Sequence, residues 1–293
     1  MKWLNRNDST SNFEDRRGRS GGGGGKLALG GIGGIIMIVI ALLMGKDPSQ
    51  VLQQVLSDNM NGGAAQTEVV DPEKARAYEE YKDFTLAVFN SCNDVWERVF
   101  AEELGQQYRK PTLVAFTDQV SSACGGASSA MGPFYCSGDE KVYIDMSFFR
   151  ELAERFRAPG DLAMAYVTAH EVGHHVQHLL GVTDKVHSMR GRISEKEYNQ
   201  LSVRLELQAD FYGGLWAHHA AKLGIIQLEG GDLESAMRAA EAIGDDALQK
   251  AAQGYAVPDS FTHGSSEQRM YWFRLGFTTG DIKLGDTFAQ SKL

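Results

Sequence analysis

The chain has 293 residues, of which 43% are hydrophobic and 23% charged, a composition typical of a globular protein with one large domain or two small ones. Its formal net charge is −9, although the first 26 residues carry six Lys and Arg against three acidic residues. The rest of the chain is therefore strongly acidic, which argues against a nucleic-acid-binding protein, because such proteins present a basic surface.

The N-terminal region predicts a tail, a membrane anchor and a linker. Residues 1–26 are basic and glycine-rich, as in a disordered tail. Residues 27–44, LALGGIGGIIMIVIALLM, hold no charge, and a membrane-spanning helix needs roughly 17–25 residues. A buried core helix and a cleaved signal peptide are the alternatives, but signal peptides have roughly 7–15 apolar residues before a small-residue cleavage site. We predict an uncleaved transmembrane helix over 27–44 and a linker over 45–70.

The distribution of positive charge predicts the orientation of this anchor. Six Lys and Arg precede it, whereas only Lys46 follows it before Asp71. The positive-inside rule then places the N-terminus in the cytoplasm and the large C-terminal part on the outer side of the membrane. The spacing of Gly30 and Gly34 is a weak indication of a homodimer through this helix; alternatively, these glycines simply continue a glycine-rich segment.

The globular part is expected over residues 71–293. Apolar residues at three- and four-residue spacing predict helices over 72–104, 146–156, 161–181, 194–221 and 232–253. Runs of β-branched and aromatic residues predict strands over 112–120 and 141–146. This pattern predicts an α+β domain that is mostly helical with a small sheet.

The three cysteines agree with a location outside the cytoplasm. Cys124 and Cys136 bracket a loop-like segment, a spacing suited to a local disulfide in an oxidising compartment. Cys92 lies in an amphipathic helical run, where we interpret it as a small core residue.

The strongest chemical signal is an H-E-x-x-H motif on the helix predicted over 161–181. His170 and His174 are four positions apart, so both imidazoles project from one side of the helix and can share a Zn²⁺ ion. Glu171 follows the first ligand and can reach a water molecule at the metal as a general base. His174 and His178 are also four residues apart, but His175 stands where the catalytic glutamate of such a pair should be. We therefore assign His175 and His178 to surface or supporting roles.

The next predicted helix offers a third metal ligand. Glu206 and Asp210 are again four residues apart, among apolar neighbours that disfavour the alternative of a solvated acidic patch. Glu206 is the expected zinc ligand. Asp210 is expected to accept the second N–H of a zinc-bound histidine, which fixes the orientation of its ring.

Together these motifs resemble the gluzincin metallopeptidases, with H-E-x-x-H on one helix and E-x-x-x-D on a later one. The segments GPFYCSGDEKVYIDMSFF, APGDLAMAYVTAHEVGHHVQHLLG, LELQAD and FTHGSSEQR resemble the bacterial family of predicted neutral zinc metallopeptidases, the YpfJ-like proteins, over roughly residues 70–290. The resemblance implies a zincin-like fold with one Zn²⁺ ion per chain. Proteins of this kind often have a single N-terminal membrane span.

The resemblance also implies roles for three further features. The segment THGSSEQR resembles the H-P-x-x-x-x-R segment of prenyl-protein proteases, with Gly264 in place of proline. His263 could then donate a hydrogen bond to the oxyanion, and Arg269 could pair with a carboxylate near the site; a buried structural histidine is the alternative. The strand KVYID at 141–145 is the candidate edge strand for an extended peptide, and a Cys124–Cys136 bridge would stiffen the rim or serve as a plain loop staple.

These features predict a membrane-anchored zinc endopeptidase that acts on polypeptides outside the cytoplasm. One rival is a non-catalytic zinc-binding scaffold, against which Glu171 argues, because a structural site does not need a base. A second rival is a zinc amidase that acts on cell-wall or other small amides, with identical metal chemistry.

Overall fold

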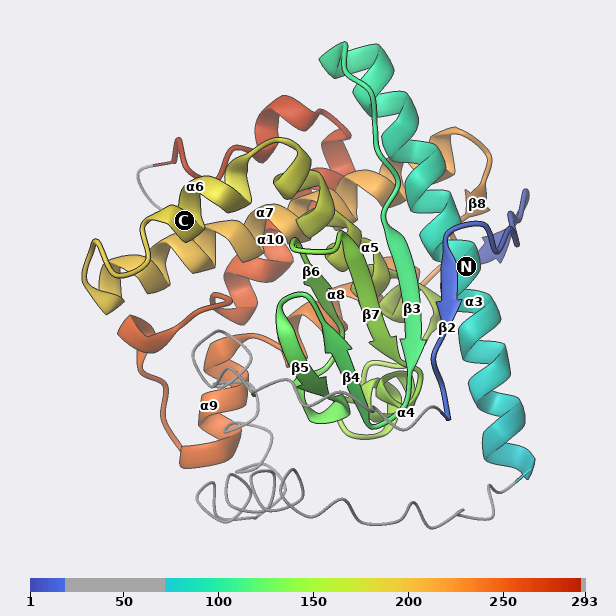
Figure 1. Ribbon diagram of the computed structural model, residues 1–293, viewed down its shortest axis with the longest axis horizontal. Helices are drawn as coiled ribbons and strands as arrows, with labels where there is room; N and C mark the ends of the chain where they lie inside the picture. The colour runs from blue at the N-terminus through green and yellow to red at the C-terminus, as the bar shows by residue number, and fades with distance from the viewer. Residues whose placement is uncertain (19–71, 291–293) are drawn as a thin grey trace.

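The computed structural model describes residues 1–18 and 72–290, and in these ranges helices pack around small β-sheets, in agreement with the α+β prediction (Figure 1). The helices are α3 (Pro72–Val99), which continues as a π-helical turn over Phe100–Leu104, α4 (Ser147–Glu154), α5 (Asp161–Leu179), α6 (Val182–Ser188), α7 (Glu195–Lys222), α8 (Asp232–Ala242), α9 (Asp245–Gln253) and α10 (Ser266–Thr279). The strands are β1 (Lys2–Trp3), β2 (Phe13–Asp15), β3 (Thr112–Phe116), β4 (Gln119–Ser122), β5 (Gly125–Ser128), β6 (Phe134–Cys136), β7 (Lys141–Asp145) and β8 (Ile226–Gln227).

The main sheet has the strand order β2-β3-β7-β6, in which only β6 runs antiparallel to its neighbour. The prediction that KVYID forms the edge strand is therefore wrong, because β7 lies between β3 and β6. The chain reverses through residues 137–140, where Glu140 has a φ of 55°, so β6 pairs along the side of β7 that would otherwise be free. The stacked rings of Phe134 and Tyr143, 4.7 Å apart, hold this pairing. Within the described ranges, the two edge strands of this sheet are β2 and β6.

Two predicted elements are each divided in the structure. The strand predicted over 112–120 breaks at Asp118, which has a φ of 62°, and gives β3 and β4. The helix predicted over 232–253 breaks at Gly244 and gives α8 and α9. A Cβ atom at Gly244 would lie 2.5 Å from the backbone nitrogen of Ser266, so the chain at this break is packed directly against the start of α10.

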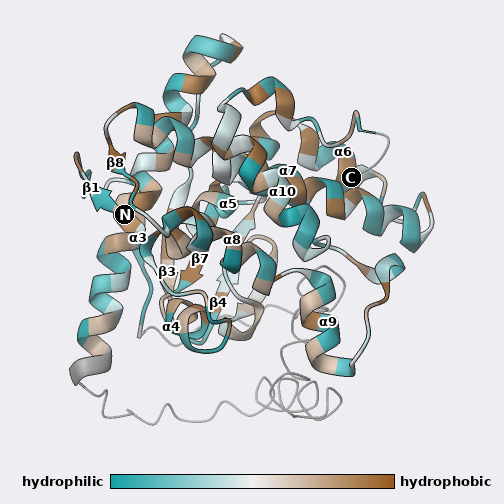
Figure 2. Cartoon of the chain, turned by 180° about the vertical axis from the view of Figure 1, so that it is seen from behind, coloured by the Kyte–Doolittle hydropathy of each residue, from teal (hydrophilic) through white to brown (hydrophobic). Residues whose placement is uncertain are grey.

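The hydrophobic core lies between the sheet and the helices α3, α5, α7 and α10. Its largest fully buried side chains include Trp96, Trp216, Tyr166, Phe211 and Phe273. Both hydrophilic and hydrophobic residues are seen along α3 in Figure 2, and its second half, from Thr85 to Asn93, is buried in this core. Cys92 is also fully buried in this core, which confirms its interpretation.

The N-terminal residues belong to this domain. Strand β1 pairs with β8, β2 pairs in parallel with β3, and both views place the N-terminus beside β8 and α3 (Figures 1 and 2). The expectation of a disordered tail over 1–26 is therefore wrong for residues 1–18. Its composition is polar, but Trp3 and Phe13 pack against the core, and the edge of β3 supplies backbone partners.

The transmembrane helix predicted over 27–44, its Gly30–Gly34 motif and the linker predicted over 45–70 lie outside the described residues. Among the helices of residues 1–18 and 72–290, none combines the length and the apolar character needed to cross a membrane.

Candidate active site

The structure brings together the three residues predicted as metal ligands. His170 and His174 project from α5 toward Glu206 on α7. The Nε2 atom of His170 lies 3.2 Å from Oε2 of Glu206, and the Nε2 atom of His174 lies 3.6 Å from Oε1 of the same carboxylate. One ligand atom from each residue lies within 4.8 Å of the other two. Two imidazoles and one carboxylate are the donor set of a catalytic zinc site that keeps a position open for water.

A glycine inside the motif lets the two helices meet. A Cβ atom at Gly173 would lie 3.0 Å from the carbonyl oxygen and 3.2 Å from the Cα atom of Ala209. A larger side chain at this position would push α5 away from α7. The distance between the two histidines and Glu206 therefore depends on this glycine as well as on the ligands themselves.

Asp210 lies one turn beyond Glu206 and contacts Nδ1 of His170, the ring nitrogen that does not face Glu206. Its Oδ1 atom is 2.8 Å from Nδ1 of His170 and also accepts a 2.6 Å hydrogen bond from the hydroxyl of Tyr166. Arg269 donates from Nε to Oδ2 at 2.8 Å and from Nη2 to Oδ1 at 2.9 Å. Both charged side chains are buried. The His263–Arg269 segment thus contributes Arg269 to the carboxylate that orients His170, a candidate metal ligand.

The charges around the cluster favour a cation at its centre. Burial alone would lower the pKa of His170, but the charge and hydrogen bond of Asp210, together with the bond to Glu206, raise it to about 10. Burial would raise the pKa of Glu206, but His174 and His170 hold it well below its usual range. For Asp210, Arg269 and His170 outweigh burial and lower the pKa to about 2. The carboxylates that favour a proton on these imidazoles would equally favour a metal ion between them.

Glu171 is suited to proton transfer. It is buried, lines the same cavity as the three candidate ligands, and belongs to α5 one residue after His170. Burial raises the pKa of its carboxyl group, an effect that His174 and His170 partly offset. A carboxylate whose pKa moves upward toward neutrality is a better general base than an exposed one.

His263 enters this cavity from the loop before α10, and Asp245 holds it there. The Nδ1 atom of His263 lies 3.1 Å from Oδ1 of Asp245, whose Oδ2 atom accepts hydrogen bonds from the backbone of Thr262, His263 and Gly264. Burial would lower the pKa of His263, but the charge of Asp245 raises it. Sequence reasoning missed Asp245, because it begins α9 at the break that was predicted as continuous helix.

His174 also has a partner that sequence reasoning missed. Its Nδ1 atom lies 2.9 Å from Oε1 of Gln177, whose amide nitrogen donates to the carbonyl oxygen of Leu205 at 2.6 Å. Gln177 is fully buried. Its three-residue distance from His174 on α5 was the available signal, since such residues are neighbours on a helix.

The two other histidines of the motif region do not join the cluster. His175 is fully buried, with Nδ1 2.9 Å from the hydroxyl of Tyr135 and Nε2 2.6 Å from the carbonyl oxygen of Arg109. It therefore ties α5 to β6 and to the chain before β3. The Nε2 atom of His178 lies 3.5 Å from Glu140, so this side chain also faces the sheet.

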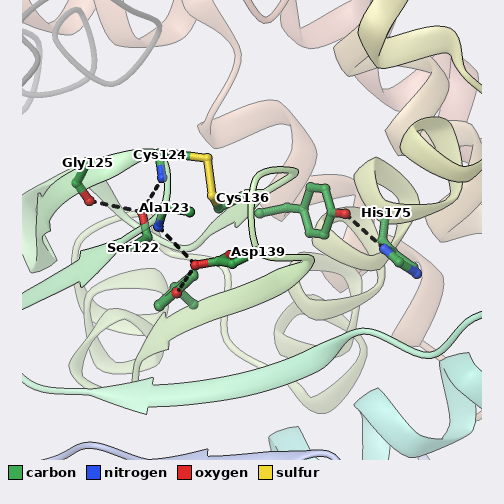
Figure 3. The surroundings of a disulfide bond; sticks show 9 residues. Ser122, Ala123, Cys124, Gly125, Cys136, Asp139 and His175 are labelled. Atoms are coloured by element: carbon green, nitrogen blue, oxygen red, sulfur yellow. Dashed lines mark hydrogen bonds between the residues drawn. A yellow bond between two sulfur atoms is a disulfide. The ribbon is translucent and has the colours of Figure 1, made fainter.

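The predicted disulfide between Cys124 and Cys136 is confirmed. It joins the turn between β4 and β5 to β6, an edge strand of the main sheet (Figure 3). Cys124 lines the cavity that contains the candidate metal ligands. The bridge is therefore part of the rim of the site.

The cavity has a volume of about 390 Å³. Its polar lining includes His170, Glu171, His174, Glu206, His263 and Arg269. Its walls are mostly apolar and include Met131, Pro133, Phe134, Phe148, Phe156, Val167 and Leu248. A larger hollow of about 1260 Å³ between α7, α10 and the C-terminal turn contains none of the candidate metal ligands. The smaller cavity is therefore the candidate active site.

Comparison with known proteins agrees with this geometry. The family model described as "Putative neutral zinc metallopeptidase" matches residues 1–288. The chain belongs to this family. It is 42% identical to the uncharacterized protein YpfJ of Escherichia coli K12 over 295 residues, which cover 99% of this chain and 100% of the relative. It is 38% identical to the uncharacterized protein Rv2575 of Mycobacterium tuberculosis H37Rv over 266 residues, which cover 86% of each chain. No solved structure gives a significant match.

Proposed function

We propose that this member of the family is a membrane-associated, zinc-dependent endopeptidase. The observation that carries the proposal is the position of Glu171, buried in an open cavity together with His170, His174 and Glu206. These three residues would hold one zinc ion per chain. When bound, zinc polarises the substrate carbonyl group and lowers the pKa of a water molecule to about 7.

The protein's own residues supply the proton transfers. Glu171 takes a proton from the attacking water and passes it to the nitrogen of the leaving amine. His263, kept protonated by Asp245, donates a hydrogen bond to the oxygen on which negative charge develops. Asp210 keeps the ring of His170 oriented so that Nε2 faces the metal position.

Two features of the cleft support an extended polypeptide as the substrate. Strand β6 is one of the two edges of the main sheet in the described ranges, and Phe134 and Tyr135 of this strand line the cavity. An extended peptide can add to such an edge through backbone hydrogen bonds. The apolar walls formed by Phe148, Phe156 and Val167 favour substrates with a large apolar side chain beside the cleaved bond. The proposal therefore implies a zincin-like arrangement, in which the metal on α5 lies beside a peptide bound along β6.

Two observations support a location at the outer face of the bacterial inner membrane. The disulfide Cys124–Cys136 is typical of an oxidising compartment. The uncharged segment 27–44 is suited to contact with lipid.

The test uses the full chain, because β1 and β2 belong to the domain. Bound metal would be measured by elemental analysis, and cleavage of an unbiased peptide library by mass spectrometry, for the native chain, Glu171→Gln and His178→Gln. We expect one zinc ion per chain in all three and cleavage only by the native and His178→Gln chains. Zinc without cleavage by the native chain would contradict the peptidase assignment, and absence of stoichiometric metal would contradict the ligand set.

A further inference from the structure

The N-terminal residues are bonded to parts of the chain that follow the apolar segment 27–44. The backbone nitrogen of Leu113 donates to the carbonyl oxygen of Asn12 at 2.9 Å, and that of Arg16 donates to Ala115 at 2.8 Å. At the other end, the nitrogen of Leu4 donates to Ile225 at 2.9 Å. Residues 1–18 therefore extend the main sheet and complete a second, smaller one.

Side chains strengthen this attachment. The amide nitrogen of Asn90 on α3 donates to the carbonyl oxygens of Asn7 and Ser9, at 2.9 Å each. The ring of Trp3 packs edge-on against Phe84, with the ring centroids 6.1 Å apart. Asn90 is buried, so its two hydrogen bonds to the N-terminal backbone satisfy a donor that would otherwise be buried without a partner.

Positive residues that predicted a cytoplasmic N-terminus are paired with carboxylates of the folded domain. Lys2 lies 2.9 Å from Glu229, which precedes α8, and Arg17 lies 2.7 Å from Glu79 on α3. A third N-terminal charge makes the reciprocal contact, because Glu14 lies 2.5 Å from Lys141 on β7. The charge of the N-terminal segment is thus complementary to the surface on which it lies.

These contacts are incompatible with a bilayer between the two parts. The hydrocarbon core of a membrane is about 30 Å thick, whereas the backbone atoms of β2 and β3 are in hydrogen-bond contact. The eighteen residues of 27–44 suffice for a single crossing only, so they cannot cross and return. A return through residues 45–71 would carry Lys46, Asp47, Asp58 and Glu68 into hydrocarbon, which is costly.

We propose that residues 1–18 and the domain formed by residues 72–290 lie on the same side of the membrane. Residues 27–44 then associate with the bilayer from that side and do not form a single-pass anchor. This replaces the orientation predicted from the positive-inside rule. The proposal does not depend on the peptidase activity, so either can fail without the other.

The side of each part can be tested with an introduced thiol in the full chain. Ser11→Cys and Gln253→Cys are exposed positions in the N-terminal segment and in α9, and a membrane-impermeant maleimide would be added to intact cells and to inverted membrane vesicles. The chain without an introduced thiol is the control, because Cys92 is buried and Cys124 is paired with Cys136. We expect both variants to be labelled in the same preparation. Labelling in opposite preparations would overturn the proposal, and a chain found wholly in the soluble fraction would overturn its membrane part.

A second experiment tests the pairing itself in membranes. Lys2 and Gln227 are register partners in β1 and β8, so a Lys2→Cys/Gln227→Cys chain would be joined by a short bis-maleimide. A protease site inserted in the segment 45–70 would then be cut. We expect the two fragments to migrate together, whereas the control pair Lys2→Cys/Gln253→Cys, with α9 far from β8 in both views, should separate (Figures 1 and 2). Separation of the Lys2–Gln227 pair would also overturn the proposal.

Discussion

Replacement of Asp210 by asparagine should remove much of the domain's stability. The substitution keeps the size of the side chain but removes the charge that pairs with Arg269 through two hydrogen bonds of 2.8 and 2.9 Å. The carboxylate is fully buried and the guanidinium is 3% exposed, so water cannot take over the lost interaction. Removing one partner of a buried ion pair, which leaves the other charge buried and unpaired, lowers the free energy of unfolding by about 3–5 kcal/mol. This is a large part of a typical protein stability of about 5–15 kcal/mol.

The assay is urea unfolding of the metal-free full chain, followed by tryptophan fluorescence. Glu80→Gln is the matched control, because Glu80 forms an exposed ion pair with Arg76 on α3 and its loss should cost at most about 0.5 kcal/mol. The double variant Asp210→Asn/Arg269→Met should lose less than the sum of the two single variants, because it leaves no unpaired charge. An Asp210→Asn chain as stable as Glu80→Gln would refute the reasoning.

Three further predictions concern the site and its supports. His263→Gln should reduce kcat about 10²–10³-fold with zinc content unchanged, because it removes the hydrogen-bond donor to the oxyanion. Asp245→Asn should move the alkaline limb of the pH–rate profile to lower pH, because Asp245 raises the pKa of His263 and the protonated ring is the donor. An unchanged kcat for His263→Gln, or an unmoved alkaline limb for Asp245→Asn, would count against this role of His263. His175 has a pKa lowered to about 4 by burial, against about 6.5 in the unfolded chain, so its contribution to stability is present above about pH 6.5 and is lost as the pH falls toward 4. Between these pH values, the free energy of unfolding of the metal-free protein, measured with urea, should therefore change less steeply with pH for His175→Gln than for the native chain. Equal pH slopes for the two chains would contradict the assignment. Gly173→Val should lower the free energy of unfolding by about 1–3 kcal/mol and weaken zinc binding, because the valine side chain would collide with Ala209. Urea unfolding and zinc titration measure these two effects. An unchanged zinc affinity would show that the contact between α5 and α7 does not set the ligand geometry.

The parts of the site that were predictable have short spacings in the sequence. His170 and His174 are one helical turn apart, as are Glu206 and Asp210, so helical periodicity alone places each pair on one face. Helix α7 begins beside the predicted start at residue 194, where the structure shows a capping box with Ser194 accepting from the backbone of Glu197. Such signals depend on residues within four positions of one another, and local geometry is enough to interpret them.

The remaining parts were decided by contacts between distant segments. Asp245 meets His263 only because Gly244 ends one helix against Ser266 and begins another. Strand β6 replaced β7 as the edge because a turn at Glu140 folds the chain back beside it.

The sequence by itself determined the chemistry of this protein: the H-E-x-x-H and E-x-x-x-D pairs, the disulfide partners and an uncharged segment long enough to reach lipid. Only the tertiary structure decided which strand borders the cleft, which carboxylate holds His263, and that residues 1–18 complete the sheet. The physical reason is that a backbone edge and a buried charge accept partners from anywhere in the chain. Hydropathy and charge counts predict a polar tail for residues 1–18 because they contain no information on the edge of β3, with which β2 pairs.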